Sequence, residues 1–389
     1  MTYHNIHRLL FTAMFLGALA CTNETKEVEN MNDDTKTTAH FTLAIGTYTQ
    51  KEGHVDGKAE GLYLYDFNSE NGQLNHQFTA KGITNPSYLN IHPNGKVLYA
   101  CSEVPENTTD KGAPFVAYAF DAEKKSLKEI SKNGTYGAYP CYVEVAPDGK
   151  NVAVANYGTG NIAVLALDKE GHFSGKVNTD RHEGVGPDTN RQEGPHAHMS
   201  TFNPKTGNLY AVDLGTDALY KYKIEGEQLS EPKVIQLPAG SGPRHMAFSP
   251  VSDYKYVITE LSGKVVVLDG NDQIMQLAET RKDPSLPATG GAIIISADGK
   301  HLYASNRIPH NDVAVFSIDP VSGLLTKKGY ISAQGTTPRD MLLSPDGKFL
   351  LIANQDSSNV TVVQLGENGL KVSSEVFEIP TPVCLKWVK

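Results

Sequence analysis

The stretch "TPRDMLLSPDGKFLLIANQ" (residues 337–355) consists of two short apolar segments joined by a Pro-Asp-Gly-Lys turn. Each apolar segment has about the length of a β-strand, and Pro, Asp and Gly favour a tight turn between antiparallel partners. The first segment follows a proline, and the second ends on Ala-Asn. The stretch therefore predicts a β-hairpin with a defined entry and a defined exit.

The same hairpin unit recurs along the chain, at residues 85–103, 139–157, 194–214, 242–261 and 290–307. Each unit is followed by a third apolar strand, such as "NVTVVQL", and then by a turn. The entry prolines return at intervals of about 45 to 55 residues, with one proline missing near Gly290 where the period is kept, and this period is typical of the four-stranded blades of a β-propeller. The repeat therefore predicts an all-β propeller.

The two ends of the chain each supply half of a further unit. "HFTLAIGTYTQ" (40–50) is a second-type strand with no first strand before it, and "TPVCLKWVK" (381–389) is a first strand with no second strand after it. Together they complete one blade, which predicts a seven-bladed β-propeller whose last blade is closed by the N- and C-terminal strands. Closure leaves no long unpaired edge. Eight blades or a solenoid are the structural alternatives, and the split repeat disfavours both.

Composition limits the class of partner. The chain has 389 residues with a net charge of −9, and its acidic residues are scattered. Binding to nucleic acid requires clustered Lys and Arg, and no basic patch occurs in the sequence. We therefore expect no nucleic-acid partner.

The N-terminal segment reads as an export signal. Residues 1–21 combine a short basic region with an apolar run that is too short to span a membrane, and the run ends at Cys21. Lipid attachment to Cys21 would tether the protein to a membrane, although Ala-Leu-Ala before it also fits ordinary signal cleavage. Residues 22–39 are polar and predict a flexible linker to a single domain at 40–389. We expect an exported protein of the periplasm or cell envelope, and a monomer.

Three cysteines remain in the domain: Cys101, Cys141 and Cys384. Export permits a disulfide, but the spacing of these residues requires none. No Cys-x-x-Cys or Cys/His zinc pattern is present.

Alignment of the units brings polar residues to repeated positions. The position just after the entry proline holds Ser87, Cys141, His196, Arg244, Arg339 and Val383. The last position of the second strand holds Ser102, Asn156, Asp213, Glu260, Asn306 and Asn354, and the next position holds Glu103, Tyr157, Leu214, Leu261, Arg307 and Gln355. Strand propensity does not select basic side chains at a strand start, so another role is expected for them.

Antiparallel pairing places the start of the first strand beside the end of the second. In a propeller the first strand lines the central channel, so both positions gather at one mouth of that channel. We therefore expect one concave site formed by His196, Arg244, Glu260, Arg307 and Arg339. Further candidate substrate-binding residues are His198, His245, Asn156 and Asn306.

These residues also have structural interpretations. An Arg or His at a strand entry can pair with an acid of the next blade, and Asn306 and Asn354 occupy positions where Asn serves as a turn former. His196 and His198 lie on one face of a strand, but their arginine companions would repel a divalent cation. We therefore expect neither a metal nor a cofactor. The Gly/Pro-rich loop 185–192 is interpreted as a lid or substrate loop.

The repeats resemble a known family. "NPSYLNIHPNGKVLYA", "VANYGTGNIAVL", "GPRHMAFSP" and "ASNR" are similar to segments of the seven-bladed lactonase family, which contains the propeller type of 6-phosphogluconolactonase and fungal muconate lactonizing enzyme. The resemblance covers roughly residues 40–389. It implies site residues at His196, Arg244, Glu260 and Arg307. The export signal departs from the family's best-known reaction, which uses an intracellular phosphorylated lactone.

The resemblance implies hydrolysis of a sugar δ-lactone, of the 6-phosphogluconolactonase type. Such a reaction needs a base for water, a stabiliser for the oxyanion and an anchor for an anionic substrate. His196 is the expected base, Arg244 the oxyanion stabiliser, and Arg307 or Arg339 the anchor, with Glu260 orienting Arg244 or sharing proton transfer. No Gly-x-Ser-x-Gly nucleophile motif is present. The alternatives are a non-catalytic envelope propeller that binds an anionic glycan or protein, and a muconate-type lactonizing enzyme.

Overall fold

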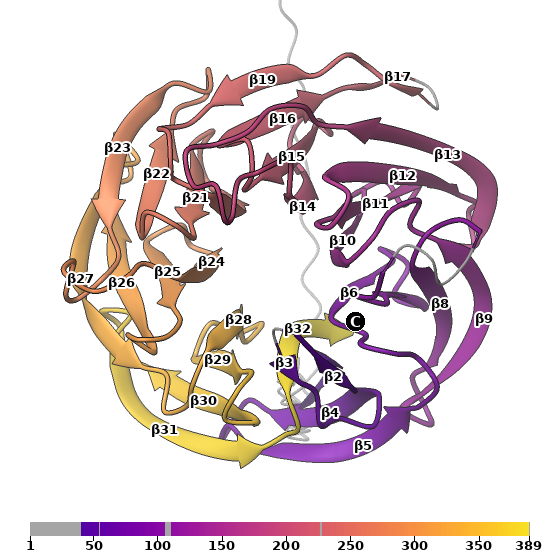
Figure 1. Cartoon of the computed structure of the whole chain (residues 1–389). Coiled ribbons are helices and arrows are strands. Elements are labelled where there is room, and N and C mark those ends of the chain that lie inside the picture. Colours follow the sequence, from indigo (N-terminus) through magenta and orange to yellow (C-terminus); the bar gives the residue numbers. More distant parts are fainter. Residues whose placement is uncertain (1–39, 54, 106–109, 226–227, 389) are drawn as a thin grey trace, which may run out of the picture. The chain divides into compact units, whose positions relative to one another are not determined.

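The computed structural model describes residues 40–388, except for residues 54, 106–109 and 226–227. Within this part of the chain, seven four-stranded antiparallel sheets form a closed ring (Figure 1). The predicted seven-bladed β-propeller is confirmed. The predicted export signal, Cys21 and the linker 22–39 lie outside the described residues. No helix among the described residues is long and apolar enough to cross a membrane.

Six blades are continuous in sequence, and each runs outward from the central channel (Figure 1). The first three are β6 (Tyr88–Ile91), β7 (Val97–Cys101), β8 (Pro114–Asp121) and β9 (Ser126–Gly134); β10 (Pro140–Val145), β11 (Asn151–Asn156), β12 (Asn161–Leu167) and β13 (Phe173–Arg181); and β14 (Ala197–Phe202), β15 (Leu209–Asp213), β16 (Ala218–Tyr222) and β19 (Lys233–Gln236). The next three are β20 (Pro243–Phe248), β21 (Lys255–Thr259), β22 (Lys264–Leu268) and β23 (Ile274–Glu279); β24 (Gly290–Ile295), β25 (His301–Asn306), β26 (Asp312–Ile318) and β27 (Leu325–Ser332); and β28 (Pro338–Leu343), β29 (Phe349–Asn354), β30 (Asn359–Leu365) and β31 (Lys371–Glu378).

The seventh blade joins the two ends of the domain. Its order is β32 (Pro382–Val388), β1 (His40–Thr47), β4 (Leu62–Asn68) and β5 (Leu74–Ala80). Strand β32 pairs antiparallel with β1, with Leu385 opposite Ile45. The Leu385 side chain is fully buried, and its backbone N–H donates to Asp340 of the neighbouring blade at 2.8 Å. This pairing is the predicted closure of the ring.

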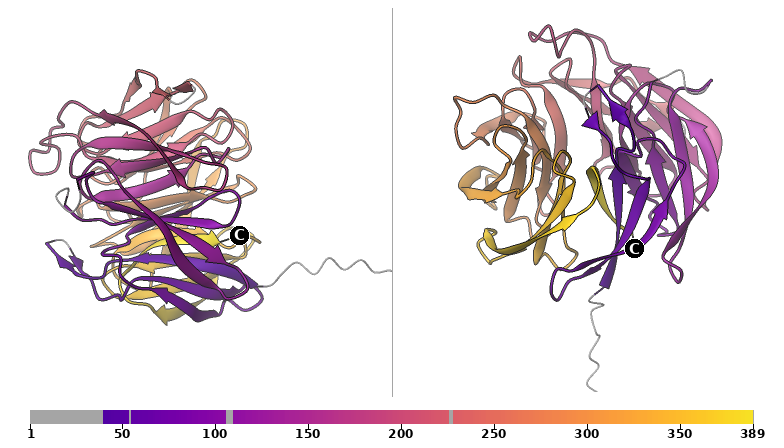
Figure 2. Two further views of the ribbon diagram at one scale, coloured as in Figure 1. Left: turned by 90° about the vertical axis from the view of Figure 1, so that its right-hand side faces the viewer. Right: turned by 60° about the horizontal axis from the view of Figure 1, so that its bottom comes forward.

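Two small hairpins add to the blades. One pairs β2 (Lys51–Glu52) with β3 (Val55–Asp56), and the other pairs β17 (Ile224–Glu225) with β18 (Gln228–Leu229). In the left view of Figure 2 the indigo hairpin β2–β3 stands out from one face of the ring. The second strands of the blades are almost fully buried, as in β7 and β29, so they form the apolar layer on which neighbouring blades pack.

The inner strands share an irregularity near their start. In β10, β14, β20 and β28 the pairing with the second strand skips one residue. The skipped residues are Cys141, His198, Arg244 and Arg339. A β-bulge of this kind turns a side chain away from the direction that regular alternation would give it. In these four blades the bulge therefore points one side chain in a different direction from the neighbouring side chains of its strand.

Candidate active site

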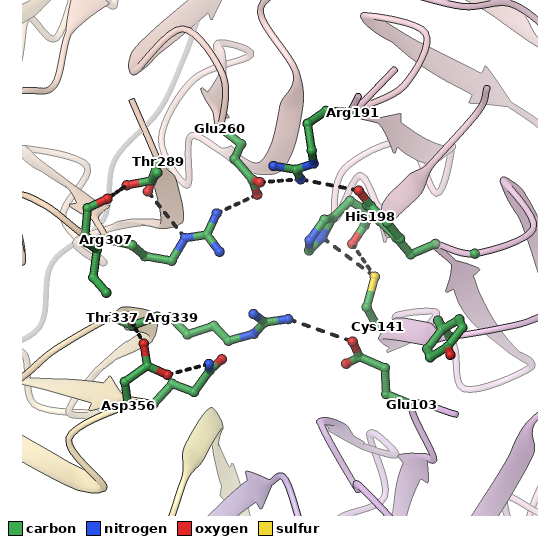
Figure 3. Close-up of a pocket in the computed structure, with 15 residues that line it drawn as sticks. Glu103, Cys141, Arg191, His198, Glu260, Thr289, Arg307, Thr337, Arg339 and Asp356 are labelled. Atoms are coloured by element: carbon green, nitrogen blue, oxygen red, sulfur yellow. Dashed lines mark hydrogen bonds and ion pairs between the residues drawn. The ribbon is translucent and has the colours of Figure 1, made fainter. Parts of the chain in front are cut away.

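A cavity of about 660 Å³ occupies one mouth of the channel, a size that suits a small-molecule ligand (Figure 3). Its polar lining comes from six blades and the loop 182–196. The lining residues that carry charge or can exchange protons are Glu103, Tyr139, Cys141, Tyr157, Arg191, His198, Glu260, Arg307, Arg339 and Asp356.

Two positions of the repeat supply most of this lining. The first is the bulge residue of the inner strand, which gives Cys141, His198 and Arg339. The second is the first or second residue after the second strand, which gives Glu103, Tyr157, Glu260, Arg307 and Gln355. Antiparallel pairing brings these two positions together in every blade. Of the five residues predicted to gather there, Glu260, Arg307 and Arg339 line this mouth, whereas His196 and Arg244 do not. Two registers also need correction.

The register predicted for His196 was wrong by two residues. Ala197 lies opposite Asp213, and the bulge residue that corresponds to Arg244 and Arg339 is His198. The register predicted for Glu260 was wrong by one, because Pro243 lies opposite Thr259 and Glu260 follows the strand. The blade at 194–214 has two residues more between its entry proline and its strand. The sequence motif alone did not show where they are accommodated.

Glu260 is the electrostatic centre of the site. Its Oε1 lies 2.6 Å from Arg191 Nη2, and its Oε2 lies 2.6 Å from Arg307 Nη2 and 3.2 Å from Arg244 Nε (Figure 3 draws the first two arginines). Burial would raise the pKa of Glu260, but Arg307, Arg191 and Arg244 together lower that pKa to about 2. Glu260 is therefore ionised at neutral pH and suits the role of an orienting counter-ion better than that of a proton acceptor.

Arg244 lies behind the cavity lining. Its side chain is 2% exposed, and Nη1 donates to the carbonyl of Gly291 at 2.9 Å. Burial, with the charges of Arg307 and Arg339, lowers the pKa of Arg244 to about 10, so the guanidinium stays charged at neutral pH. The acid that Arg244 contacts, Glu260, belongs to the same blade, so the predicted pairing with an acid of the next blade is not what Arg244 makes. Its contact with the next blade is the bond to the Gly291 carbonyl.

His198 lies on the cavity wall beside Cys141, whose Sγ is 3.7 Å from His198 Nδ1 (Figure 3). Burial, followed by the charges of Arg244 and Arg339, lowers the pKa of His198 well below its ordinary value of 6.5. His198 is therefore a neutral imidazole at neutral pH. Burial also raises the pKa of the Cys141 thiol, so this thiol is protonated and is not an activated nucleophile.

His196 and His245 do not line the cavity. His196 stacks on Tyr157 with ring centroids 4.5 Å apart, and its two ring nitrogens contact the Tyr157 carbonyl at 3.0 Å and Glu193 at 3.1 Å. His245 is buried and packs edge to face against Tyr142 and His198. Both histidines support residues of the wall.

On the opposite side of the cavity, Arg339 packs over the ring of Tyr48 and donates to its hydroxyl at 2.9 Å. Glu103 lies 3.9 Å from the same guanidinium. Asp356 accepts hydrogen bonds from the hydroxyl of Thr337 and from Gln355 Nε2 (Figure 3). This side therefore combines one guanidinium with two carboxylates.

The two candidate asparagines are buried and bond to the protein itself. Asn156 donates to the carbonyl of Thr135 at 2.8 Å, and Asn306 donates to the carbonyl of Thr280 and to Asp312. Neither lines the cavity. Each asparagine connects the end of its second strand to the residue that follows the outer strand of the preceding blade, so both have a structural role between blades.

Comparison with known proteins decides the family. The sequence profile of "Lactonase, 7-bladed beta-propeller" matches residues 42–387. The chain belongs to this lactonase family. The resemblance read from its repeats is thereby confirmed.

Curated relatives of this lactonase-family chain include the 6-phosphogluconolactonase of Bacillus subtilis, which is 32% identical over 88% of this chain and 97% of the relative. A 6-phosphogluconolactonase of Formosa agariphila is 33% identical over 82% of this chain and 91% of the relative. Among solved structures, a putative 6-phosphogluconolactonase of Bacteroides fragilis has a TM-score of 0.83 and 32% identity over 92% of this chain and 100% of that one. The periplasmic gluconolactonase of Pseudomonas aeruginosa has a TM-score of 0.80 and 29% identity over 90% of this chain and 99% of that one.

Sequence reasoning missed several residues of this site. Arg191 was read only as part of a loop, and Glu103 and Tyr157 only as a register position. For Glu103 and Tyr157 the sequence did contain an indication, because the same position of the repeat carries Arg307, which was predicted as a site residue. Asp356 follows Gln355 and had no signal in the repeat. The cysteines Cys101, Cys141 and Cys384 are buried free thiols, which answers the open question of a disulfide among them.

Within the described part of the chain, no group of three or more His, Cys, Asp or Glu side chains has the arrangement of a metal site. The cavity walls nevertheless hold ionisable groups of both signs at short distances from one another. Such a site can bind a polyhydroxylated, partly anionic ligand and can stabilise a developing negative charge.

Proposed function

We propose that this protein hydrolyses sugar δ-lactones in the cavity at the channel mouth. The observation that carries the proposal is the neutral His198 on a cavity wall that also presents the guanidiniums of Arg307 and Arg339. The names of the relatives, 6-phosphogluconolactonase and gluconolactonase, support the same reaction. A neutral imidazole accepts a proton from water, and a guanidinium stabilises an oxyanion.

The proposed reaction begins with a water molecule held near His198. The water oxygen attacks the lactone carbonyl carbon while His198 accepts its proton. The negative charge that develops on the carbonyl oxygen is stabilised by Arg307, which Glu260 holds in place at 2.6 Å. The ring C–O bond then breaks, and the protonated His198 returns its proton to the leaving ring oxygen. The product is the open-chain aldonic acid, which ionises to the aldonate and releases a proton.

We also propose that the protein is exported and that its substrate lactone is anionic. The leader at residues 1–21 supports export, so the lactone would be encountered outside the cytoplasm. An anionic lactone fits the arginine-rich wall. We also propose that the protein is a monomer and that a lipid attached to Cys21 tethers it to a membrane.

The test is hydrolysis of glucono-δ-lactone and of its 6-phosphate, followed by acid release against a buffer control in the presence of EDTA. We expect saturable turnover that survives chelation, disappears in His198→Ala and remains in His196→Ala. The second variant is a matched control, because His196 lies in the same blade but off the cavity lining. No turnover above buffer on either lactone would overturn the proposal and leave a binding propeller.

A further inference from the structure

We propose that Arg191 is a specificity-determining residue that binds an anionic substituent of the lactone, either a phosphate monoester or a carboxylate. The inference rests on the proposed lactone hydrolysis and adds to it a residue that reads the substrate. Arg191 lies on the loop 182–196 and lines the cavity directly.

The hydrogen bonds of Arg191 leave part of its guanidinium available. Its bonds to Glu260 at 2.6 Å and to the Tyr157 hydroxyl at 3.3 Å are both made by Nη2. Among the described residues, Nε and Nη1 of Arg191 have no acceptor. The side chain is 41% exposed, whereas Arg244 is 2% exposed and Arg307 is 15% exposed. Arg191 therefore has two nitrogens left, each of which can donate a charge-assisted hydrogen bond to a phosphate or carboxylate oxygen.

The charges around the cavity are unevenly distributed. Three guanidiniums surround the single carboxylate of Glu260, which leaves an excess of positive charge on that side. The facing side has Arg339 with two carboxylates, Glu103 and Asp356. Figure 3 shows this division, with Arg191, Glu260 and Arg307 across the cavity from Arg339, Glu103 and Asp356. An anionic group is therefore favoured on the Arg191 side, and sugar hydroxyls find acceptors on the facing side.

Arg307 is less able to fill this role, because two of its three guanidinium nitrogens are already engaged and its side chain is less exposed. Nε donates to the carbonyl of Thr289 at 3.3 Å, and Nη2 donates to the carbonyl of Gly290 and to Glu260. These bonds fix Arg307 between its own blade and the neighbouring blade of Glu260. A fixed guanidinium suits an oxyanion whose position is set by the reaction, while Arg191 remains for the substituent.

The loop that carries Arg191 is held by buried carboxylates. Asp213 binds both of its ends, since Oδ2 lies 2.7 Å from His182 Nδ1 and Oδ1 accepts the backbone N–H of His196 at 2.9 Å. The buried neighbour Gln192 donates to Asp217 at 2.8 Å. The loop is therefore fixed at both ends and also at Gln192, the residue that follows Arg191. Such a loop loses little conformational freedom when an anion binds.

The experiment compares Arg191→Gln with the wild type on glucono-δ-lactone, its 6-phosphate, and D-glucaro-1,5-lactone, a δ-lactone that carries a carboxylate. We expect kcat/KM to fall about 10- to 100-fold for the anionic lactone that the protein uses, as loss of a charge-assisted hydrogen bond implies. The loss for neutral glucono-δ-lactone should be smaller than the loss for the anionic lactone, because Glu260 keeps its contacts with Arg307 and Arg244. The two anionic substrates distinguish a phosphate reader from a carboxylate reader. Arg191→Lys should restore part of the loss.

Arg181→Gln is the matched control, because Arg181 is exposed at the end of β13 near the same loop and does not line the cavity. Equal losses on neutral and anionic lactones, or no loss in Arg191→Gln, would overturn the inference while leaving the proposed function standing.

A binding measurement separates this inference from a failure of catalysis. Calorimetry with 6-phosphogluconate, glucarate and gluconate needs no turnover. Weaker binding of 6-phosphogluconate or of glucarate by Arg191→Gln, with gluconate binding unchanged, supports the inference even where no lactone is hydrolysed. Equal binding by wild type and variant, or no binding of either of these two anions by the wild type, overturns it.

Discussion

Arg307 Nη2 lies 2.6 Å from Glu260 Oε2, and these two residues occupy the same position of adjacent repeats. Each follows the last residue of its second strand, Thr259 in β21 and Asn306 in β25. The repeat therefore places opposite charges at equivalent points of neighbouring blades. The same contact joins the blades and orients an arginine of the cavity, so stability and activity depend on one carboxylate.

Replacement of Glu260 by Gln should destabilise the protein by about 3–5 kcal/mol, because Arg244 would remain buried without its counter-charge. Urea unfolding measures the change in free energy. Glu193→Gln is the control, since Glu193 is 59% exposed and its loss should cost no more than about 0.5 kcal/mol. Equal unfolding midpoints for the two variants would show that the arginines do not need Glu260.

The stabilisation by Glu260 should also depend on pH. The folded-state pKa of about 2 lies below the ordinary value of 4.5, so the unfolded state takes up the proton first as the pH falls. The contribution is therefore complete above about pH 4.5 and is lost as the pH falls toward 2. The difference in unfolding free energy between wild type and Glu260→Gln should shrink across this window. A difference that stays constant from pH 6 to pH 3 would contradict the depressed pKa.

The seven-bladed ring could be predicted because its information is local and repeated. The proline entry, the Pro-x-Gly-Lys turn and the apolar second strand each appear several times, so an error in one unit is corrected by the others. The split blade of β32 and β1 followed from the same count. Closure of the ring needs no information beyond the two half units.

The cavity residues were harder to predict because they depend on features that vary between blades. A bulge of one residue selects Arg244 and Arg339, but two additional residues before β14 move the same position from His196 to His198. Sequence periodicity does not show where extra residues are absorbed. Arg191 comes from a loop outside the repeat, and only the folded structure brings it to Glu260.

Closure by β32 should be essential for the stability of the ring. Leu385 is fully buried opposite Ile45, so Leu385→Ala should cost about 2–5 kcal/mol. Val376→Ala on the outer strand β31 is the control, since Val376 is 43% exposed. Thermal unfolding of the two variants measures the difference. A loss for Leu385→Ala as small as that for Val376→Ala would mean that the terminal strand adds little to the closed ring.

The acid side of the pH–rate profile tests His198 as the base. Burial and then the charges of Arg244 and Arg339 lower the pKa of His198 below 6.5, so its imidazole stays neutral and active at pH 6.5. We therefore expect kcat/KM to be constant down to pH 6.5 and to decline only at lower pH, after subtraction of spontaneous lactone hydrolysis. His198→Gln should lower kcat about 10²- to 10⁴-fold and remove this decline, while His196→Gln should keep it. A decline centred at or above pH 7, or an equal loss in both variants, would assign the proton transfer to another group.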